Sequence, residues 1–268
     1  MPTDKPLVTV IIPVYSQPNL LFKTIDSVLN QIGVTPCRII VVDDHSPERI
    51  NRLVSRRYPQ VTVIRNRTNL KSGPSRNQAL KFIRTKYVAF LDYDDIWLPD
   101  FLQTSISFLQ NSDCIGSTVL PIPVFDKFYP ISQQIKKRML LLIWDLLYFV
   151  FYNFNHKRLP QTAFYLGQIS HLLFKSEAIK GPKFDPNYNF GGEDWKFMLE
   201  VMDRGSIGII PDRLVKYRYH PASSIQKPIN VLNKWKSYKQ LFPEIAKRGL
   251  HGPMIELLKY YIKTFETK

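Results

Sequence analysis

Short, uniformly apolar runs alternate with amphipathic stretches along the first half of the chain. Such runs are typical of strands buried on both faces of a parallel sheet, and they lie at 7–14, 38–42, 61–64 and 87–91. Hydrophobic residues at helical spacing predict helices at about 19–32, 48–57 and 75–85. Alternating strands and helices predict an α/β fold with a Rossmann-like, mostly parallel central sheet flanked by helices.

The pattern changes after a further strand predicted at 114–120. Residues 121–165 interrupt the alternation around one very apolar run, 139–154, which has basic residues on both sides. This run of 16 residues is short for a membrane-spanning helix, which needs about 20 apolar residues. Two interpretations stay open: a helix buried against the protein, or a helix lying in a membrane interface.

The alternation then resumes towards the C-terminus. Strands are predicted near 169–174, 207–210 and 214–219, a helix from about Glu193, and basic helices at about 229–247 and 253–265. We therefore expect one domain over 1–224, with a nucleotide-binding part at about 1–120 and an acceptor-side part at about 121–224. The acceptor-side part would contain a helical insertion near 135–158, and 225–268 would form a basic helical extension.

Composition narrows the class of protein. The chain has 268 residues, of which 44% are hydrophobic, enough for a packed core. Its two cysteines, Cys37 and Cys114, form neither a metal-binding nor a redox spacing, and the N-terminal sequence does not resemble a signal peptide. We expect a reducing, cytoplasmic location, with the cytoplasmic face of a membrane as an open alternative.

The net charge of +15 implies an anionic partner. The strongest acidic clusters lie at 43–44, 92–95 and 193–194, while 203–268 is basic. An acidic site on a basic protein suits a cation with phosphates better than a nucleic-acid groove, so we expect no nucleic-acid partner.

Polar residues follow the ends of three predicted strands. Tyr15 and Ser16 follow the first, Asp43 and Asp44 the second, and 92–95 the fourth. Ligands of open α/β sheets bind beyond the carboxyl ends of the strands, so these residues are expected to line one crevice.

The sequence FLDYDD is the first candidate for chemistry. If the strand geometry continues, Asp92 and Asp94 point the same way. Carboxylates are the ligands that Mg²⁺ and Mn²⁺ prefer. An Asp-rich turn before a helix is the alternative.

Other candidates have structural alternatives as well. Asp44 is suited to a nucleobase or ribose, or to capping a helix. Glu193 and Asp194 open a helix, where the helix dipole alone favours acids, but a carboxylate there is also suited to deprotonating a hydroxyl. Arg218 is suited to a phosphate, and His220 to a metal or to acid–base chemistry.

Together these motifs resemble the family 2 glycosyltransferases of the GT-A fold, which use nucleotide-diphosphate sugars. The matching stretches are VTVIIPVYS at 8–16, VVDDHS at 41–46, NLKSGPSRNQA at 69–79, FLDYDD at 90–95, GGEDW at 191–195 and YRYHPASS at 217–224. The chain departs from the family's pattern at Ser16, where the family often has Asn, and at His45, where it often has Gly. The family also favours glycines where this chain has Leu70 and Lys71.

The resemblance implies a role for each matching residue. Pro13 and Tyr15 would border the base, Asp44 would bind it, and Arg76 would lie near base and diphosphate. Asp92 would contact the ribose, Asp94 would ligate Mn²⁺ or Mg²⁺, and His220 would be a second metal or diphosphate contact. Asp194 would be the catalytic base of an inverting reaction, and Glu193 would orient acceptor or sugar. We add Lys71 as a further phosphate contact; Asp95 has no assigned role.

The implied enzyme is a hexosyl- or hexosaminyltransferase of cell-surface glycan biosynthesis. A UDP-sugar is the favoured donor, and a saccharide or lipid-linked saccharide the acceptor, with peripheral membrane association left open. A glycosidase also uses paired carboxylates but has no need of nucleotide-site motifs. A nucleotidyltransferase would carry a glycine-rich basic loop after its first strand, and a nucleic-acid- or membrane-binding module would not need FLDYDD. The remaining alternative is an inactive nucleotide-sugar or membrane-binding module of the same fold.

Overall fold

The structure is a computed structural model. It describes residues 5–34, 37–135, 138–139, 168–188 and 192–220, with short stretches between 236 and 247. Most of the predicted insertion at 135–158, the apolar run beyond Met139, the boundary near 224 and the predicted helix at 253–265 lie outside these residues. The described residues between 236 and 247 are helical, in agreement with the helix predicted at 229–247.

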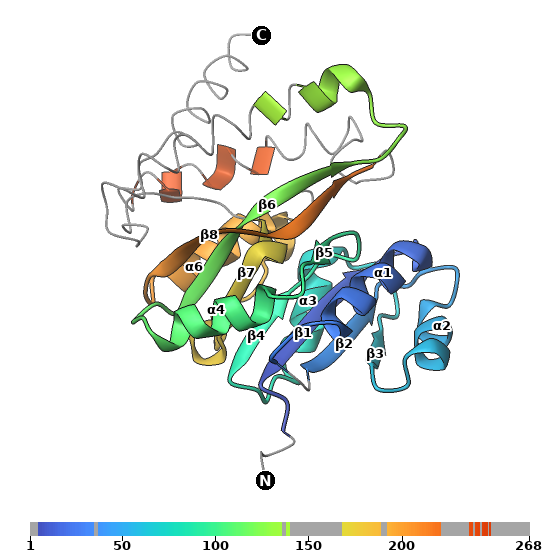
Figure 1. Ribbon diagram of the computed structural model, residues 1–268, viewed down its shortest axis with the longest axis horizontal. Helices are drawn as coiled ribbons and strands as arrows, with labels where there is room; N and C mark the ends of the chain where they lie inside the picture. The colour runs from blue at the N-terminus through green and yellow to red at the C-terminus, as the bar shows by residue number, and fades with distance from the viewer. Residues whose placement is uncertain are drawn as a thin grey trace.

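One eight-stranded sheet forms the centre of the molecule (Figure 1). Its strands are β1 Val8–Val14, β2 Cys37–Asp43, β3 Thr62–Arg65, β4 Tyr87–Phe90, β5 Ile96–Trp97, β6 Gly116–Phe125, β7 Leu172–Lys175 and β8 Ile207–Tyr219. The order is β3-β2-β1-β4-β7-β6-β8-β5. Strands β1 to β4 are parallel, as are β6 and β8; β7 runs antiparallel to β4 and β6, and β5 runs antiparallel to β8. The mostly parallel sheet is confirmed.

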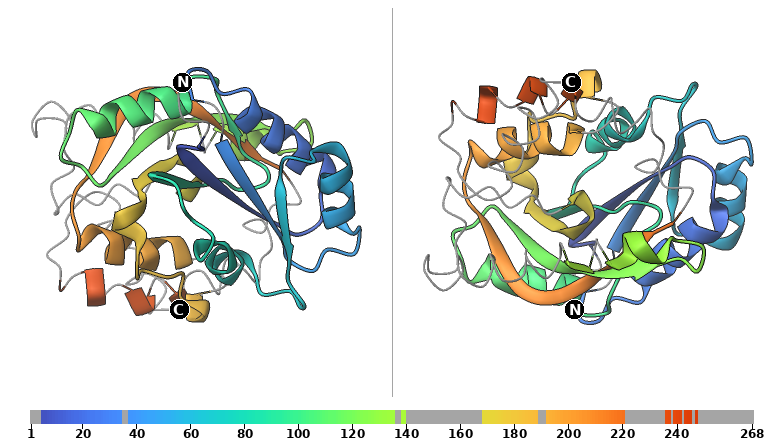
Figure 2. Two further views of the ribbon diagram at one scale, coloured as in Figure 1. Left: turned by 90° about the horizontal axis from the view of Figure 1, so that it is seen from below. Right: turned by 90° about the horizontal axis from the view of Figure 1, so that it is seen from above.

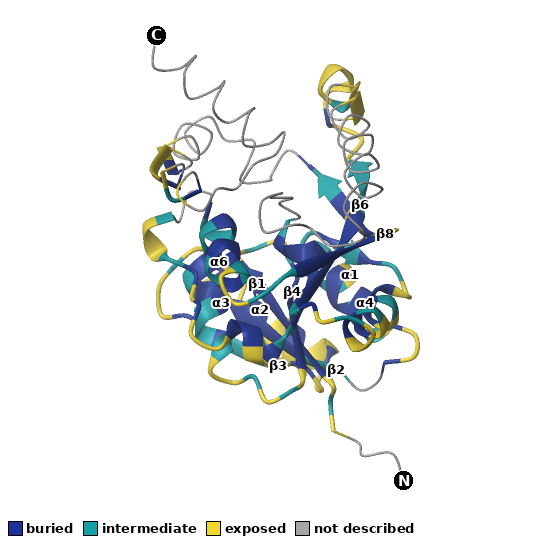
Figure 3. Cartoon of the chain, turned by 90° about the vertical axis from the view of Figure 1, so that its left-hand side faces the viewer, coloured by how far each residue is buried: buried dark blue, intermediate teal, exposed yellow. Residues whose placement is uncertain are grey.

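Helices cover both faces of this sheet (Figure 2). They are α1 Pro18–Leu29, α2 Ile50–Arg57, α3 Ser72–Leu80, α4 Phe101–Gln110 and α6 Glu193–Met202, with 3₁₀ turns η1 Ile169–His171, η2 Ser176–Ile179 and η3 Pro186–Tyr188. Alternate residues of β1 separate the two cores, because side chains of a strand point to opposite faces in turn. Val10 and Ile12 pack with α1, α2 and α4, whereas Ile11 packs with α3 and α6. Strands β1 and β4, in the middle of the sheet, are buried throughout, whereas β3 at its edge is partly exposed (Figure 3).

Several predicted boundaries were wrong. The two strands expected at 207–210 and 214–219 are one strand, β8, whose pairing with β6 shifts register between Val119 and Pro121. This bulge lets Pro211 and Asp212 stay within an extended strand while both are exposed. The strand expected at 169–174 starts with the 3₁₀ turn η1, and the helix expected at 75–85 runs instead over Ser72–Leu80.

Strands β6 and β8 continue as a two-stranded ribbon past the point where β7 ends its pairing with β6 at Thr118 (Figure 1). The ribbon places the C-terminal end of β8 beside the ends of β4 and β5, since β5 pairs with β8 at Val215 and Lys216. Within the described part of the chain, no helix has the length and hydrophobicity to span a bilayer.

Candidate active site

The acidic residues 92–95 form a turn immediately after β4. The Asp95 amide donates to the Asp92 carbonyl at 3.1 Å, which closes a four-residue turn. One carboxylate oxygen each from Asp92, Asp94 and Asp95 lies within 4.8 Å of the others. The prediction that Asp92 and Asp94 point the same way through continued strand alternation was wrong in its reason, because β4 ends at Phe90. The turn itself gathers the three carboxylates.

This Asp-rich turn is held from both sides by neutral polar groups. From α1, the Thr24 Oγ1 lies 2.7 Å from the Tyr93 carbonyl and 2.8 Å from the Asp95 carbonyl, and its one proton serves one of them at a time. From η1, the Ser170 Oγ accepts from the Asp92 amide at 3.0 Å, and the Ser170 carbonyl accepts from the Trp97 indole at 2.9 Å. Groups of α1 and η1 therefore hold the turn in place.

The end of β8 supplies the basic groups beside this turn. The His220 Nε2 lies 2.8 Å from the Asp94 Oδ2, so the structure brings together the two residues expected to bind the metal. Arg218 does not point to an open phosphate position: its Nε donates to the Asp94 carbonyl, and its Nη2 reaches the Leu20 carbonyl at 3.5 Å. Arg218 thus joins the Asp-rich turn to α1.

Asp95 is the buried member of the cluster, with only 1% of its surface exposed. Burial, and then the charges of Asp94 and Asp92, raise the pKa of Asp95 well above its ordinary value. Its Oδ1 accepts from the Arg218 amide at 3.3 Å, while its Oδ2 has no hydrogen-bond partner among the described residues. A buried, unpartnered carboxylate oxygen costs free energy unless a proton or cation neutralises it.

These residues fit a divalent cation. Crowded carboxylate oxygens with an imidazole nitrogen form the kind of ligand set that Mn²⁺ accepts, and Mg²⁺ would use the carboxylates with phosphate oxygens. The unpartnered oxygen of Asp95 and the crowding of like charges are the observations that favour a cation here.

A second acidic group lies across a buried arginine from the first. The Arg76 Nη2 donates to the Asp92 Oδ1 at 2.5 Å, and its Nη1 is 3.6 Å from the Glu193 Oε1. Ser72 also donates to Glu193, at 2.8 Å. Burial lowers the pKa of the Arg76 guanidinium, but the charges of Asp92 and Glu193 outweigh it and raise the pKa above its usual value. Arg76, 2% exposed, therefore stays charged and links the two acidic groups.

Asp194 follows Glu193 in the first turn of α6, where its Oδ1 accepts from the Trp195 amide at 2.9 Å. Gly192, before the helix, has a φ of +95° that favours glycine. A Cβ at this position would lie 3.3 Å from the Leu241 side chain. The start of α6 is thereby fixed against the C-terminal region, with both acids at the arginine-bridged end of the site.

Asp44, which was expected to bind the base, accepts three hydrogen bonds from groups of the protein. Its Oδ1 accepts from the Asn66 amide group and the Leu70 amide, and its Oδ2 accepts from the Lys71 amide. Only 4% of Asp44 is exposed. Asp44 therefore fixes the loop that leads into α3, and Lys71, exposed at the start of that helix, remains available to a ligand.

The remaining predicted residues lie along the first strand, where Pro13 is buried in β1 and Tyr15 is 49% exposed just beyond it. Sequence reasoning missed Thr24 and Ser170, which position the Asp-rich turn. Thr24 carried a signal, because it is a polar residue on the buried face of an amphipathic helix. Ser170 carried none.

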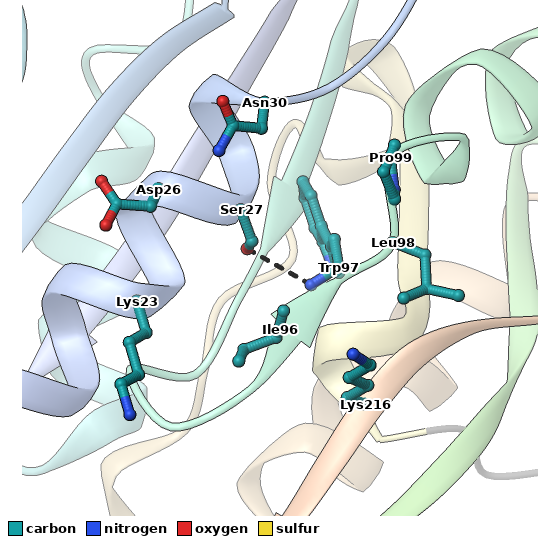
Figure 4. Close-up of a pocket in the computed structure, with 9 residues that line it drawn as sticks. All are labelled: Lys23, Asp26, Ser27, Asn30, Ile96, Trp97, Leu98, Pro99 and Lys216. Carbon is teal, nitrogen blue, oxygen red and sulfur yellow. Dashed lines mark hydrogen bonds between the residues drawn. The ribbon is translucent and has the colours of Figure 1, made fainter.

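A separate groove of about 330 Å³ lies between α1, β5 and β8 (Figure 4). Lys23 and Lys216 lie on its exposed rim, and the Ser27 hydroxyl accepts from the Trp97 amide in its wall at 3.3 Å. Its carboxylate, Asp26, is already engaged by the Tyr58 hydroxyl at 2.8 Å. The groove brings together no set of groups with evident chemistry, so the site of interest is the acidic one.

Comparison with known proteins agrees with this geometry. The chain is 28% identical to an uncharacterized glycosyltransferase of Methanocaldococcus jannaschii, over 80% of this chain and 71% of the relative. It is 34% identical to the putative teichuronic acid biosynthesis glycosyltransferase TuaG of Bacillus subtilis, over 42% of this chain and 46% of that relative. The chain thus matches less than half the length of TuaG.

Solved structures share the fold at low sequence identity. S. aureus TarS 1–349 in complex with UDP-GlcNAc has a TM-score of 0.67 at 17% identity, over 91% of this chain and 68% of that one. A mannosyltransferase from Pyrobaculum calidifontis in complex with GDP-Man and Mn²⁺ has a TM-score of 0.65 at 17% identity, over 96% of this chain and 69% of that one. The GT-A fold is confirmed.

A family model settles the assignment. The model of glycosyl transferase family 2 matches residues 9–176, which include the Asp-rich turn, Asp44 and Arg76. The sheet, its ligand-binding edge and this match agree with one another: the chain belongs to glycosyl transferase family 2 and is a glycosyltransferase.

Proposed function

We propose that this glycosyltransferase moves a hexosyl or hexosaminyl group from a UDP-sugar to a hydroxyl of a saccharide or lipid-linked saccharide. The reaction would invert the anomeric centre, need Mn²⁺ or Mg²⁺, and serve cell-surface glycan biosynthesis. The observation that carries the proposal is the pair of acidic groups joined by Arg76: the Asp-rich turn with His220 on one side, and Glu193 with Asp194 on the other.

The Asp-rich turn is suited to the donor. Asp92 would accept from the ribose hydroxyls, and Asp94 with His220 would hold the cation beside the diphosphate. A divalent cation bound there would supply positive charge to the departing diphosphate. Lys71 would add a further cation at the start of α3, while Pro13 and Tyr15 would border the base. Asp44 would bind the base through Oδ2, which accepts one hydrogen bond in the structure.

The start of α6 is suited to the acceptor. Asp194 would take the proton of the acceptor hydroxyl as its oxygen bonds to the anomeric carbon. The bond from that carbon to the diphosphate breaks, and the nucleoside diphosphate leaves with the electron pair. Glu193, held by Ser72 and Arg76, would orient the sugar. Two separate acidic groups suit the two duties, because a base must be free to accept a proton while the leaving group needs neutralisation.

The names of similar proteins and the ligands bound in their structures bear on the donor and the product of this chain. TuaG is named for teichuronic acid biosynthesis, TarS 1–349 was solved with UDP-GlcNAc, and the Pyrobaculum enzyme with GDP-Man and Mn²⁺. These names support a nucleotide sugar, a cation and a surface-polymer product for this chain.

A panel of nucleotide sugars, each with and without Mn²⁺, tests the proposal through thermal stabilisation and turnover. A bound ligand raises the unfolding temperature by mass action. We expect a UDP-sugar with Mn²⁺ to stabilise the chain, Asp94→Ala to abolish the Mn²⁺-dependent part, and the exposed control Asp212→Asn to change nothing. The anomeric configuration of the product, read by NMR, reports inversion.

Asp194→Asn separates the enzyme from an inactive binding module. We expect this variant to keep donor stabilisation but to lose turnover by about 10²-fold or more, the usual contribution of a general base. Donor binding without turnover in the unmodified chain would favour the binding module instead, and Mn²⁺-independent turnover would contradict the role of the cation.

A further inference from the structure

Four large hydrophobic side chains form an exposed stripe just beyond β6. Phe128, Ile131, Ile135 and Met139 are 72%, 74%, 54% and 58% exposed. Ile131, Ile135 and Met139 are spaced by four residues, which places them on one face of a helix, and residues 131–135 and 138–139 are helical; Phe128 lies in the turn just before this helix. We call these four residues the apolar face. In Figure 3 the segment continuing from β6 is largely exposed.

The apolar face differs from the other exposed hydrophobic residues of the described chain. Leu7, Tyr15, Ile32, Leu53 and Phe82 are 36–56% exposed and belong to separate elements. Single exposed hydrophobic residues are normal on a soluble surface, whereas a continuous stripe marks an interaction site.

The opposite side of the same segment is anchored to the protein. Tyr129, only 3% exposed, packs against Phe125 and Tyr219 with ring centroids 5.5 Å and 5.8 Å away. The Asp126 amide donates to the Tyr219 carbonyl at 2.9 Å, and the Gln134 side chain donates to the Tyr129 carbonyl at 2.8 Å. The inner face of the segment therefore packs on the ribbon, whereas the four hydrophobic residues of its outer face are each more than half exposed.

Basic residues belong to the same segment as the apolar face. The Lys127 Nζ lies 4.8 Å from the Phe128 ring centroid, and the Arg138 guanidinium lies 5.6 Å from that of Phe125. Residues 127–144 include four Lys and Arg residues and no Asp or Glu. Hydrophobic side chains that enter the acyl region, with cations at the level of the headgroups, match an anionic lipid surface. A nucleic acid would use the cations but would gain little from Ile131, Ile135 and Met139.

We propose that the apolar face docks the protein on an anionic phospholipid membrane. Resting on the proposed function, this docking favours a lipid-linked saccharide as the acceptor, because the segment is fixed to Tyr219, the residue before His220. His220 in turn lies 2.8 Å from Asp94, so the membrane contact and the donor half of the site share one strand end. Docking would bring the sugar donor to the lipid surface where such an acceptor resides.

Vesicle flotation of the full chain tests the proposal without donor, metal or acceptor. We expect binding to vesicles of phosphatidylglycerol mixed with phosphatidylcholine, and much weaker binding to phosphatidylcholine alone. Ile131→Ser with Ile135→Ser should lower the affinity roughly tenfold or more, because interfacial binding scales with the apolar area that enters the lipid. Ile32→Ser, at a 56% exposed isoleucine that is not part of the apolar face, is the matched control.

Charge variants test the second half of the proposal. Lys127→Gln and Arg138→Gln should each lower affinity for anionic vesicles by about fivefold, since each basic residue near such a surface contributes about 1 kcal/mol. Arg52→Gln and Arg56→Gln, exposed on α2, should leave it unchanged. Unchanged binding in the double Ile variant, or equal affinity for both vesicle types, would overturn the proposal.

Two further readouts separate the possible failures. If light scattering shows a dimer that the double Ile variant abolishes, and the chain does not float with vesicles, a second copy covers the face and the proposal is wrong. Stabilisation by a nucleotide sugar with Mn²⁺ should persist in the double Ile variant, because neither isoleucine is among the residues assigned to the donor. Failure of the unmodified chain to bind anionic vesicles therefore counts against docking alone, whereas failure of any nucleotide sugar to stabilise the unmodified chain counts against the proposed function.

Discussion

Among single residues, Arg76 connects the two acidic groups of the candidate site. It is buried, and its planar fork reaches Asp92 at 2.5 Å and Glu193 at 3.6 Å. A lysine keeps the charge but presents one ammonium in place of the fork. We expect Arg76→Lys to lower the free energy of unfolding by about 1–3 kcal/mol and to raise the KM for the donor, because Asp92 loses its positioning partner.

Thermal unfolding and nucleotide-sugar titration measure the two effects. Arg57→Lys is the control, since Arg57 is 56% exposed and its nearest distance to Asp26 is 3.8 Å, so its pair contributes little. An unchanged donor KM in Arg76→Lys would show that Asp92 is positioned by the turn alone.

His171 predicts a pH dependence of stability. It is 3% exposed, both ring nitrogens lack hydrogen-bond partners among the described residues, and burial lowers the pKa of His171 to about 3. The unfolded chain, with an ordinary histidine pKa near 6.5, binds the proton more readily. Stability is therefore full above about pH 6.5 and falls as the pH drops, by on the order of 2 kcal/mol at pH 5.

Denaturant unfolding between pH 5 and pH 8 measures this dependence. His171→Phe should flatten it, because the phenyl ring cannot titrate and still packs against Tyr217. His45→Asn, at an exposed histidine with φ +65°, a backbone conformation that Asn tolerates, should retain the wild-type slope. An equal pH dependence in the unmodified chain and in His171→Phe would show that His171 titrates normally.

In the candidate site, the sequence predicted the charged residues but not Thr24 and Ser170, the neutral groups that position them. Asp94 and His220 were predicted together and do lie together, because each belongs to a motif at a strand end. The contacts of Arg76 with Asp92 and Glu193 were not predictable, since they depend on side-chain geometry and Glu193 lies more than 100 residues further along the chain. The assigned chemical roles stay predictions.

Among elements, α3 begins with a strained residue. Lys71, its N-cap, has φ +73° and ψ +176°, a combination reached almost only by glycine. We expect Lys71→Gly to raise the free energy of unfolding by roughly 1 kcal/mol, because relief of strain exceeds the added freedom of the unfolded chain. Donor affinity should fall if the Lys71 ammonium contacts the diphosphate.

Chemical denaturation and donor titration separate the two outcomes. Leu70→Gly, at the preceding residue, is the control: its backbone has no positive φ, so glycine there should lower stability. A loss of stability in Lys71→Gly would contradict the strain, and an unchanged donor affinity would remove Lys71 from the phosphate site.

Elements with strong periodicity were predicted well, and their ends were not. Strand β1 and helix α1 were confirmed to within a few residues, because hydrophobic spacing reports burial directly. The sequence did not predict that β8 is one continuous strand, because Pro211 and Asp212 in its middle are exposed residues of the types that usually form turns. Only the partner strand β6, whose register shifts there, explains why the chain stays extended.

At the scale of the whole molecule, the order of strands and helices was enough to predict the α/β class and the edge where ligands bind. The antiparallel insertion of β7 between β4 and β6 was not predictable, because apolar strands buried on both faces carry no mark of direction. Ser170, just before β7, is thereby placed where its Oγ accepts a hydrogen bond from the Asp92 amide of the Asp-rich turn.

The hydrogen bonds of Thr24 and Ser170 with the Asp-rich turn predict the heat-capacity change of Mn²⁺ binding. Because these contacts already hold the turn in place, Mn²⁺ should exchange bound water for carboxylates without ordering further residues. We therefore expect the heat-capacity change of Mn²⁺ binding to stay within about 0.1 kcal/mol/K of zero, since ordering some ten residues would contribute more than that. In Thr24→Val, which lacks the hydroxyl, the change should become more negative as cation binding takes over the ordering of the turn.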